Sequence, residues 1–576
     1  MRHSTSHILM QALERLYGAI PGVGPAIEEG FYHDFDAKHR VTEEDLPTIE
    51  KEMKKIIKEN LKIKRKMMKI DEGIKFLRGK EYKYTLELAE DLKKKGEKEI
   101  SFYEQGGFIN MCRGPHMEKT GEINPETFKL TKVAGSYWKG SEKNKMIQRV
   151  YGVVFKTKKE LDDYLKMAEE AEKRDHRKLG SELELFMISE EVGRGLPLWL
   201  PKGAFIRKKL EDYMYEKEFK AGYKLVYTPA LTHKKLYEIS GHLAHYKEDM
   251  YAPVDIEGEE YYLKPMNCPH HHMIYNHKLL SYRDLPLRLA EFGLIHRYER
   301  SGVLTGLIRA RCFTQNDSHI YCQRKQLKSE LVGVLKLCKE VYKDFGIKDF
   351  WFRLSLPDFA NKEKFGDIEN KEMWEEAAKS AREAMDEFGV RYVEGIGEAT
   401  FYGPKIDVQV RNVSGKEDTI ATAQIDFYSP GRFNLFFVNE KGGKEHAVII
   451  HRAIMGSFDR FFAFLTEQTA GAFPLWLSPV QVKIISVGEA HVDHCRRLAD
   501  EFKEHGIRAE VDDRDETVGN KIRKAVGEKI PYMLVIGDKE IESDKLAVRE
   551  RGKKETKETS KEDFIREIRE KAGRMG

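Results

Sequence analysis

Two strand-like segments joined by an arginine-rich loop most constrain the fold of this sequence. Residues 285–297 read as an apolar strand, and residues 309–322 alternate apolar and polar side chains as a second strand does. A planar guanidinium holds a phosphate or carboxylate at two points and keeps its charge. Among the arginines of this stretch, Arg297, Arg309 and Arg311 flank the loop. The stretch predicts a hairpin that presents fixed cations to an anion, with a solvated surface hairpin as the alternative.

The overall composition excludes several classes of protein. The 576 residues predict about three to five domains, and a net charge of +4 gives no sign of a polyanion binder. No apolar run reaches the roughly 18 residues of a membrane span, and the start MRHSTSHILM lacks the build of a signal peptide. Six cysteines without a CxxC pair argue against a disulfide framework. We therefore expect a cytoplasmic protein without membrane association.

The order of strand and helix patterns predicts a multidomain α+β protein. Residues 1–155 combine helices, among them a basic helix over about Leu46–Lys69, with short strands, and a charged linker helix follows over 156–180. Residues 181–478 mix strands and helices without regular alternation, which favours a mostly antiparallel sheet flanked by helices. Residues 479–576 alternate strand and helix and predict a compact α/β domain.

A first cluster of histidine and cysteine comes from two distant segments. His3 and His7 are four residues apart and share one face of a predicted helix, and Cys112 and His116 have the same spacing. Four such residues are a common zinc-site pattern. They fit equally well a polar cleft whose imidazole and thiol groups position a substrate or a water molecule. The residues alone leave both interpretations open.

Two further segments carry candidate metal ligands. Cys268 precedes three consecutive histidines at 270–272, and adjacent histidines point in different directions, so the thiolate is the strongest ligand there. His451 precedes a helical run that contains Arg460, and Gly456 would let the backbone approach a ligand closely. Taken singly, a histidine of the core or surface is the commoner explanation for each.

Taken in order, several motifs resemble those of class II aminoacyl-tRNA synthetases, and specifically the threonyl-tRNA synthetase family. They are KPMNCP at 264–269, FTQNDSH at 313–319, FYGPK at 401–405 and HRAIMGSFDRF at 451–461. HSTSH with CRGPH is similar to the editing domain of that family, and PVQV with PYMLVIGDKE resembles its anticodon-binding domain. The resemblance covers essentially the whole chain. It implies an editing domain over 1–155, a catalytic domain over 181–478 and an anticodon-binding domain over 479–576.

The resemblance implies a threonine–tRNA ligase. In the family reaction, threonine and ATP, with Mg²⁺, form threonyl-adenylate, and threonine is then transferred to tRNA(Thr). Arg297 would hold the α-phosphate and the threonine carboxylate, Arg460 would hold the far phosphates, and Glu299 and Arg309 would bracket the adenine and phosphate region. Fixed cations suit this role because negative charge builds up on phosphorus. The family also implies a homodimer, which would form through Gly222–Pro229.

The resemblance also implies one zinc ion per subunit, held by Cys268, His319 and His451. Three protein ligands leave open positions for the amino and hydroxyl groups of threonine. Valine cannot ligate, and a site that requires a hydroxyl rejects its isostere strongly. Asp317 would accept the hydroxyl proton. The other residues that would line the threonine pocket are Met266, Gln315, Tyr402 and Gln424.

Serine keeps the hydroxyl and still fits, so pocket contacts reject it by only about 1–3 kcal/mol. The resemblance therefore implies a second site that hydrolyses Ser-tRNA(Thr) by positioning water. Its residues would be His3, His7, Lys83, Tyr103, Cys112 and His116. In the C-terminal domain, Glu540 and Arg549 match positions that bind splayed anticodon bases.

The chain departs from the family pattern at several places. Asn110 stands where the family usually has Asp, and His33 where it commonly has Tyr, so we expect slowed or altered editing, because Asn cannot accept a proton as a carboxylate does. The other departures are His270, Thr305, Cys312, Asn316 and the pair Asp418-Thr419. We also expect a short form without the family's ubiquitin-like domain, or a misplaced start. Rival hypotheses are an RNA-binding regulator without catalysis and a ligase of changed specificity.

Overall fold

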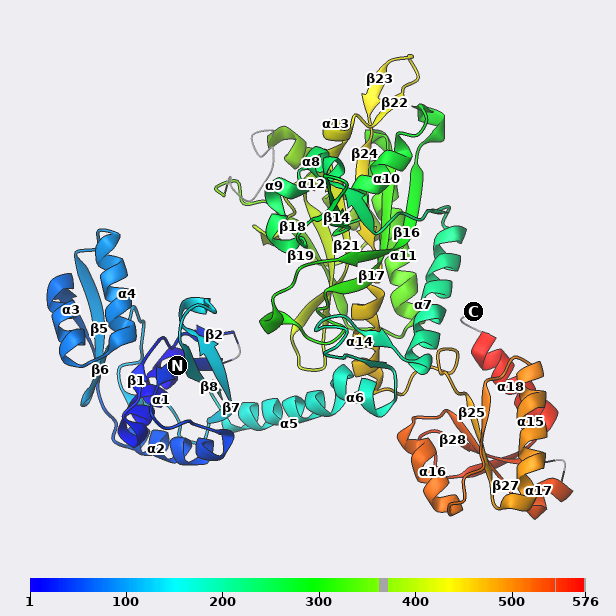
Figure 1. Ribbon diagram of the computed structural model, residues 1–576, viewed down its shortest axis with the longest axis horizontal. Coiled ribbons are helices and arrows are strands. Elements are labelled where there is room, and N and C mark those ends of the chain that lie inside the picture. The colour runs from blue at the N-terminus through cyan, green and yellow to red at the C-terminus, as the bar shows by residue number, and fades with distance from the viewer. Residues whose placement is uncertain (29, 362–370, 544, 574–576) are drawn as a thin grey trace. The chain divides into compact units, whose positions relative to one another are not determined.

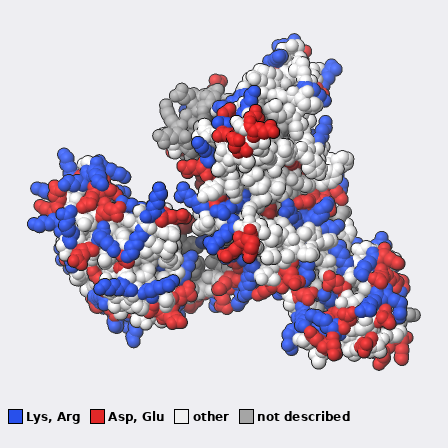
Figure 2. Space-filling model, in the orientation of Figure 1, with Lys and Arg blue, Asp and Glu red and all other residues white. Residues whose placement is uncertain are grey.

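The computed structural model describes residues 1–28, 30–361, 371–543 and 545–573. The chain divides into two compact units, Met1–Glu169 and Glu170–Gly576 (Figure 1). Figure 2 shows basic and acidic side chains interspersed over the visible face of both units, in keeping with the small net charge. Within the described ranges, no helix is both long and apolar enough to cross a membrane.

The first unit packs four helices against two small antiparallel sheets. The larger sheet has the order β1-β3-β8-β7, with β2 beside β3, and shares one core with α1 and α2. The smaller sheet, β4-β5-β6, packs against α3 and α4. The bounds are α1 (Arg2–Tyr17), β1 (Ile20–Pro21), β2 (Ala26–Ile27), β3 (Gly30–Asp36), α2 (Leu46–Lys58), β4 (Ile63–Lys69), α3 (Ile70–Gly79), α4 (Lys83–Lys94), β5 (Glu99–Gln105), β6 (Phe108–Met111), β7 (Phe128–Tyr137) and β8 (Met146–Val154).

The prediction of a basic helix over 46–69 is wrong for the second half of that range. α2 ends at Lys58, and Asn60 adopts a φ of 52° that turns the chain. Residues 63–69 form strand β4 instead, which pairs antiparallel with β5. Lysine and methionine favour helix, so the pairing with β5 overrides the local preference.

The predicted linker helix consists of two helices, α5 (Lys158–Arg174) and α6 (His176–Glu182). The side chain of Asp175 accepts a hydrogen bond from the backbone N–H of Arg177 and so caps α6. A capping aspartate in a non-helical conformation therefore separates two segments whose apolar periodicity reads as continuous.

The second unit contains the antiparallel sheet that the sequence predicts. Eight strands have the order β11-β16-β17-β24-β21-β20-β18-β19, and only the pairs β11·β16 and β18·β19 are parallel within the described residues. Helices α7, α11, α12 and α14 share its core. Their bounds are β11 (Lys224–Leu225), β16 (Leu287–His296), β17 (Cys312–Cys322), β18 (Phe350–Leu356), β19 (Tyr392–Ile396), β20 (Lys405–Arg411), β21 (Glu417–Asp426), β24 (Val448–Ala453), α7 (Pro201–Lys220), α11 (Leu327–Asp344), α12 (Lys371–Phe388) and α14 (Phe458–Thr469).

Short elements border this sheet. They form the small sheets β9-β10, β12-β14-β13 and β15-β22-β23 and four short helices. The bounds are β9 (Phe186–Met187), β10 (Leu198–Trp199), β12 (Leu231–His233), β13 (Val254–Ile256), β14 (Glu259–Leu263), β15 (Leu280–Ser281), β22 (Phe436–Val438), β23 (Lys444–His446), α8 (Lys234–Ser240), α9 (His242–His245), α10 (Cys268–Tyr275) and α13 (Ser429–Phe433).

The C-terminal part of the second unit is the predicted α/β fold. Its sheet has the order β26-β25-β27-β28-β29, parallel over the first three strands and antiparallel over the rest. The bounds are β25 (Val482–Ser486), α15 (Val492–Glu504), β26 (Ala509–Asp512), α16 (Val518–Gly527), β27 (Tyr532–Ile536), α17 (Asp538–Glu542), β28 (Lys545–Glu550), β29 (Thr556–Ser560) and α18 (Lys561–Gly573).

A buried polar network ties the central strands to the end of α7. The Arg452 guanidinium donates to Glu218 Oε1 at 2.7 Å, and Asn316 Nδ2 donates to the same oxygen at 2.7 Å. Arg452 also lies 4.2 Å from the centre of the Tyr223 ring. Arg452 and Asn316 are at most 1% exposed. The amide of Asn316, one of the departures from the family pattern, therefore serves as a donor to a buried carboxylate.

We predict that Asn316→Asp lowers the free energy of unfolding by about 1–3 kcal/mol, because a second carboxylate would face Glu218 in the core. The double variant Asn316→Asp/Glu218→Gln is expected to recover most of this loss, since an amide again faces a single carboxylate. Denaturant unfolding of the full chain measures both values. Losses that simply add in the double variant would contradict the proposed pairing.

Candidate functional site

The predicted arginine hairpin is confirmed. β16 and β17 pair antiparallel from Leu287↔Tyr321 to His296↔Cys312, and residues 297–311 connect them. The connection folds back on itself, because the backbone N–H of Arg297 bonds to the carbonyl of Arg311 at 3.0 Å. Both ends of the loop are thus fixed to each other.

A cavity of about 570 Å³ lies against this loop, and three guanidinium groups line it. Arg297 comes from the end of β16, Arg309 from the loop, and Arg460 from the first turn of α14. Arg309 pairs with Glu299 at 2.9 Å and Arg460 with Asp418 at 3.0 Å. These pairs keep the guanidinium groups extended at the cavity wall, where they can hold an anion such as a phosphate chain.

The third loop arginine has a different role. Arg311 does not line the cavity; it donates to the carbonyls of Glu299 at 2.9 Å and Arg194 at 3.2 Å. Arg311 therefore stabilises the loop. Neither its residue type nor its position in the sequence distinguishes its role from that of Arg297 and Arg309.

Cys268, His319 and His451 converge from α10, β17 and β24. One ligand atom from each lies within 4.8 Å of the others. The strand register creates half of this arrangement, because His319 stands directly opposite His451 in the β17·β24 pair. Desolvation and the nearby carboxylates of Asp317 and Asp426 raise the pKa of the Cys268 thiol well above its usual value. A bound cation would compensate the negative charge gathered there.

The hydrogen bonds around the two histidines assign their tautomers. His271 Nε2 lies 3.1 Å from Glu291 Oε2, and His271 Nδ1 lies 2.8 Å from His319 Nδ1. The carboxylate holds the His271 proton on Nε2, so His319 Nδ1 donates and His319 Nε2 keeps a lone pair. His451 Nε2 donates to Asp426 Oδ2 at 2.8 Å, which leaves its Nδ1 free to ligate. The donor set of one thiol and two such imidazoles fits zinc with positions left open.

Most of the other predicted pocket residues gather around this trio. Asp317 is buried and accepts from Asn267 Nδ2 at 3.0 Å. Tyr402 stacks on the His451 ring at 5.0 Å and hydrogen-bonds to Gln424. Met266 Sδ lies 3.1 Å from His242 Nε2. Gln315, two residues before Asp317, lines the arginine cavity instead.

Sequence reasoning missed three residues of this site: His271, Glu291 and Asp426. The signal for His271 was present in the run of three histidines, but spacing cannot say which of them faces the metal ligands. Glu291 and Asp426 lie inside strand-like segments, where a single acid is easily taken for a surface residue. Their burial, 2% and 0% exposed, appears only when the strands are paired.

The departures at 305, 312 and 419 all lie near the arginine cavity, and His270 lies apart from it. Thr305 and Thr419 line the cavity, and Thr419 Oγ1 hydrogen-bonds with the Gln409 amide at 2.8 Å. Cys312 Sγ is 3.5 Å from His296 Nε2 at the start of β17. His270 Nε2 hydrogen-bonds with Thr232 Oγ1 at 2.6 Å.

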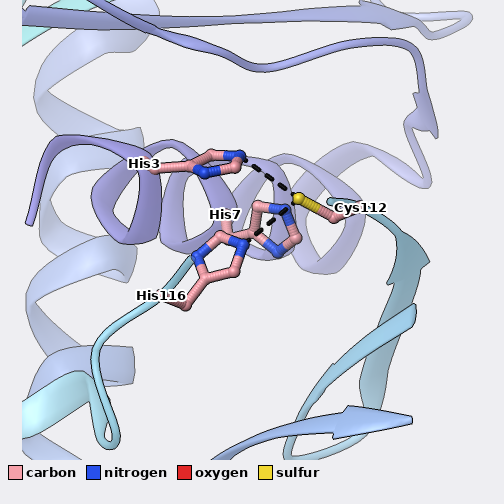
Figure 3. Close-up of side chains that lie close together, drawn as sticks. All are labelled: His3, His7, Cys112 and His116. Carbon is pink, nitrogen blue, oxygen red and sulfur yellow. Dashed lines mark hydrogen bonds between the residues drawn. The ribbon is translucent and has the colours of Figure 1, made fainter. Parts of the chain in front are cut away.

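The first unit contains a second cluster, formed by His3, His7, Cys112 and His116 (Figure 3). Cys112 Sγ lies 3.2 Å from both His3 Nε2 and His116 Nε2. The side chains of His3 and His7 project from the same face of α1, as their spacing predicts. Burial and the neighbouring imidazoles lower the pKa of His116 to about 3 and that of His7 well below its usual value. The cluster is therefore neutral at physiological pH.

A cavity of about 1000 Å³ adjoins this cluster. His3, His7 and Cys112 line it together with His33 and Asn110, the two departures from the family pattern in this domain. Tyr103 contacts the cluster through an edge-on ring contact with His116 at 4.4 Å. Lys83 does not line the cavity, because it pairs with Asp36 at 2.6 Å. The assignment of Lys83 to this site therefore lacks geometric support.

Glu540 and Arg549 of the C-terminal domain are not joined by a hydrogen bond or ion pair within the described residues. Glu540 Oε2 accepts from the backbone N–H of Gly537 at 3.0 Å at the start of α17. Arg549 lies on β28, opposite Thr556 of β29 and Met533 of β27. Both side chains are half-buried and can still contact a ligand.

Three family descriptions match separate parts of the chain. Residues 100–151 match the threonyl and alanyl tRNA synthetase second additional domain. Residues 247–469 match the tRNA synthetase class II core domain (G, H, P, S and T), and residues 481–571 match an anticodon binding domain. Unlike these partial matches, similarity to whole relatives extends over nearly the full chain.

A threonine–tRNA ligase of Geobacillus kaustophilus is 52% identical over 100% of this chain and 88% of its own length. One of Staphylococcus carnosus is 50% identical over 98% and 87%. A crystal structure titled as the RNA binding domain of threonyl-tRNA synthetase from Cryptosporidium parvum is 37% identical, with a TM-score of 0.64 over 69% of this chain and 98% of its own. The chain therefore belongs to the threonyl-tRNA synthetase family of class II aminoacyl-tRNA synthetases.

Proposed function

We propose that the protein is a threonine–tRNA ligase that activates threonine with ATP and Mg²⁺ and transfers it to tRNA(Thr). One observation carries the proposal: strand β17 begins beside a cavity lined by three arginines and, five and seven residues on, presents Asp317 and His319 near Cys268 and His451. A site for a phosphate chain and a site for a small polar amino acid thus share one strand. Adenylate formation requires both substrates side by side.

The arginines would act on the phosphates of ATP. We assign Arg297 to the α-phosphate and the threonine carboxylate, and Arg460 to the far phosphates. When the carboxylate attacks the α-phosphorus and pyrophosphate leaves, negative charge grows on the phosphate oxygens, and guanidinium groups already held in place stabilise it. The Glu299–Arg309 pair would border the nucleotide.

The threonine pocket would select by ligation. A zinc ion held by Cys268, His319 and His451 would supply open coordination positions to the amino and hydroxyl groups of threonine. Asp317 would accept the hydroxyl proton. Met266, Tyr402 and Gln424 would form the remaining walls of the pocket, while Gln315 lines the arginine cavity.

The cavity of the first unit would hydrolyse Ser-tRNA(Thr). The ordinary binding pocket rejects serine weakly, because serine keeps the hydroxyl and lacks only one methyl. The neutral imidazole and thiol groups of the cluster, with Tyr103 beside them, can hydrogen-bond a water molecule and the ester without repelling the substrate's ammonium group. Lys83 stays outside this proposal, since it is paired with Asp36.

The remaining partners are tRNA and a second copy of the chain. Glu540 and Arg549 would bind anticodon bases, which RNA-binding proteins recognise when the bases are splayed apart. A homodimer would form through Gly222–Pro229. Tyr227 is 80% exposed and Phe219, just before the segment, is 67% exposed, and large exposed aromatic side chains favour a protein interface.

We predict that Arg297→Ala and Arg460→Ala each reduce the rate of threonine-dependent ATP–pyrophosphate exchange by about 100- to 1000-fold, since each removes a fixed cation from the phosphates. Exchange of radiolabelled pyrophosphate measures this rate. The matched control is Arg283→Ala, because Arg283 is exposed and, among the described residues, its guanidinium hydrogen-bonds with the Tyr282 hydroxyl alone. Wild-type exchange in either cavity variant would contradict its assigned role.

Removal of zinc is predicted to abolish threonine activation. Metal analysis of the purified protein should find one zinc per chain, and Cys268→Ala should lose it, while Cys495→Ala in the C-terminal domain should keep it. Exchange that survives complete zinc removal, with valine still rejected, would contradict the zinc site and leave the ligase function standing.

Asn110→Asp is predicted to accelerate hydrolysis of Ser-tRNA(Thr) by about tenfold or more, because it restores a carboxylate able to accept a proton. Asn110 Oδ1 accepts from the backbone N–H of Met111 at 2.9 Å, a bond that aspartate can keep. Deacylation of Ser-tRNA(Thr) by the two full-length proteins gives the comparison. Equal and fast rates would show that this departure has no effect on editing.

A further inference from the structure

One ring nitrogen of His33 has a hydrogen-bond partner, and the other has none among the described residues. Its Nδ1 lies 2.8 Å from the backbone carbonyl of Asp34, and a carbonyl can only accept, so the proton lies on Nδ1. Burial lowers the pKa of His33 to about 4. The ring is therefore neutral at physiological pH, and Nε2 carries a lone pair. No described residue donates a hydrogen bond to this nitrogen, and the side chain lines the cavity of the first unit.

The other polar groups at the cavity form contacts that differ from those of His33. The His3 and His116 rings both contact the Cys112 thiol through Nε2. Asn110 uses its oxygen to accept from Met111, so the group that it turns elsewhere is the amide NH₂, a donor. The carboxylates that line the cavity (Asp91, Glu97 and Glu99) are at its solvent-exposed part.

The surrounding structure fixes the His33 ring in place. His33 pairs with Val150 in the β3·β8 register, and the next residue, Asp34, forms an ion pair with Arg149. Gly24 packs on the ring edge: a Cβ at position 24 would lie 2.1 Å from His33 Cδ2 and 2.7 Å from Nε2. A side chain at position 24 would therefore collide with the His33 ring.

We propose that His33 Nε2 accepts the hydrogen bond of the attacking water in the editing cavity, in place of the carboxylate that Asn110 lacks. The proposal rests on the proposed hydrolysis of Ser-tRNA(Thr). The buried His7 lines the same cavity as His33. An acceptor in this wall is what a water molecule needs for orientation before attack.

The step balances as an ester hydrolysis. The water oxygen bonds to the seryl carbonyl carbon, and one water proton passes to His33 Nε2. The bond between that carbon and the ribose oxygen then breaks, and the ribose oxygen takes up the proton. Free serine and deacylated tRNA leave, and His33 returns to its neutral form. No further reactant is consumed.

The test compares two substitutions at His33 in the full-length protein. His33→Leu removes the acceptor and keeps an apolar group of similar volume, whereas His33→Gln offers an amide oxygen near the position of Nε2. For deacylation of Ser-tRNA(Thr), we expect His33→Leu to lower kcat about 100-fold with an unchanged KM. We expect His33→Gln to recover most of the rate, and both variants to charge tRNA with threonine at the wild-type rate.

The controls separate the possible failures. His39→Gln changes a surface histidine of the same unit and should hydrolyse at the wild-type rate, while Cys112→Ala should be inactive. If the wild type does not hydrolyse Ser-tRNA(Thr), the proposed editing function fails first. If the wild type is active, an unchanged kcat in His33→Leu, a rise in KM alone, or equal losses in the Leu and Gln variants would each overturn the role of His33.

Discussion

The register of four adjacent strands is the constraint on which the catalytic unit depends. In the order β16-β17-β24-β21, one cross-strand row contains Leu289, His319, His451 and Gln424. Side chains alternate between the two faces of a strand, so a slip of one residue in any pair would turn a ligand toward the opposite face. The apolar residues on the other face, such as Ile320 and Ile450, are completely buried. Core packing thereby fixes the positions of His319 and His451.

The two clusters of histidine and cysteine contain the same residue types but differ in their hydrogen-bond partners. Around Cys268, carboxylates at Glu291 and Asp426 hold the protons of imidazoles, so that lone pairs face inward beside a thiol. Around Cys112, the sulfur contacts the imidazole nitrogens of His3 and His116 and accepts a hydrogen bond from the backbone N–H of Gly114. Both groups of side chains are close enough to hold a metal ion, but only the first has buried carboxylates hydrogen-bonded to its imidazoles among the described residues. Spacing in the sequence does not distinguish them.

The sequence could predict the elements that depend on interactions between residues close together in the chain. The alternation over 309–322 was sufficient for strand β17, and the strand–helix alternation after 479 was sufficient for the C-terminal fold. Strand β4 was missed because its lysine-rich residues are mostly exposed, so no apolar alternation marks it. Lys83 was placed in a site from motif likeness alone, whereas its charge is paired with Asp36. Partners across hundreds of residues, such as Glu218 and Arg452, leave no local pattern.

Strand β17 carries Asp317 and His319. The polar network at the end of α7 links this strand to a turn at the surface. Asn316, immediately before Asp317, is bound to Glu218, and Arg452 joins Glu218 to Tyr223. Exposed Phe219 and Tyr227 flank this same turn of chain. A displacement of this turn would change the hydrogen bonds of the buried Glu218 carboxylate, and through Asn316 it would disturb the position of the neighbouring Asp317.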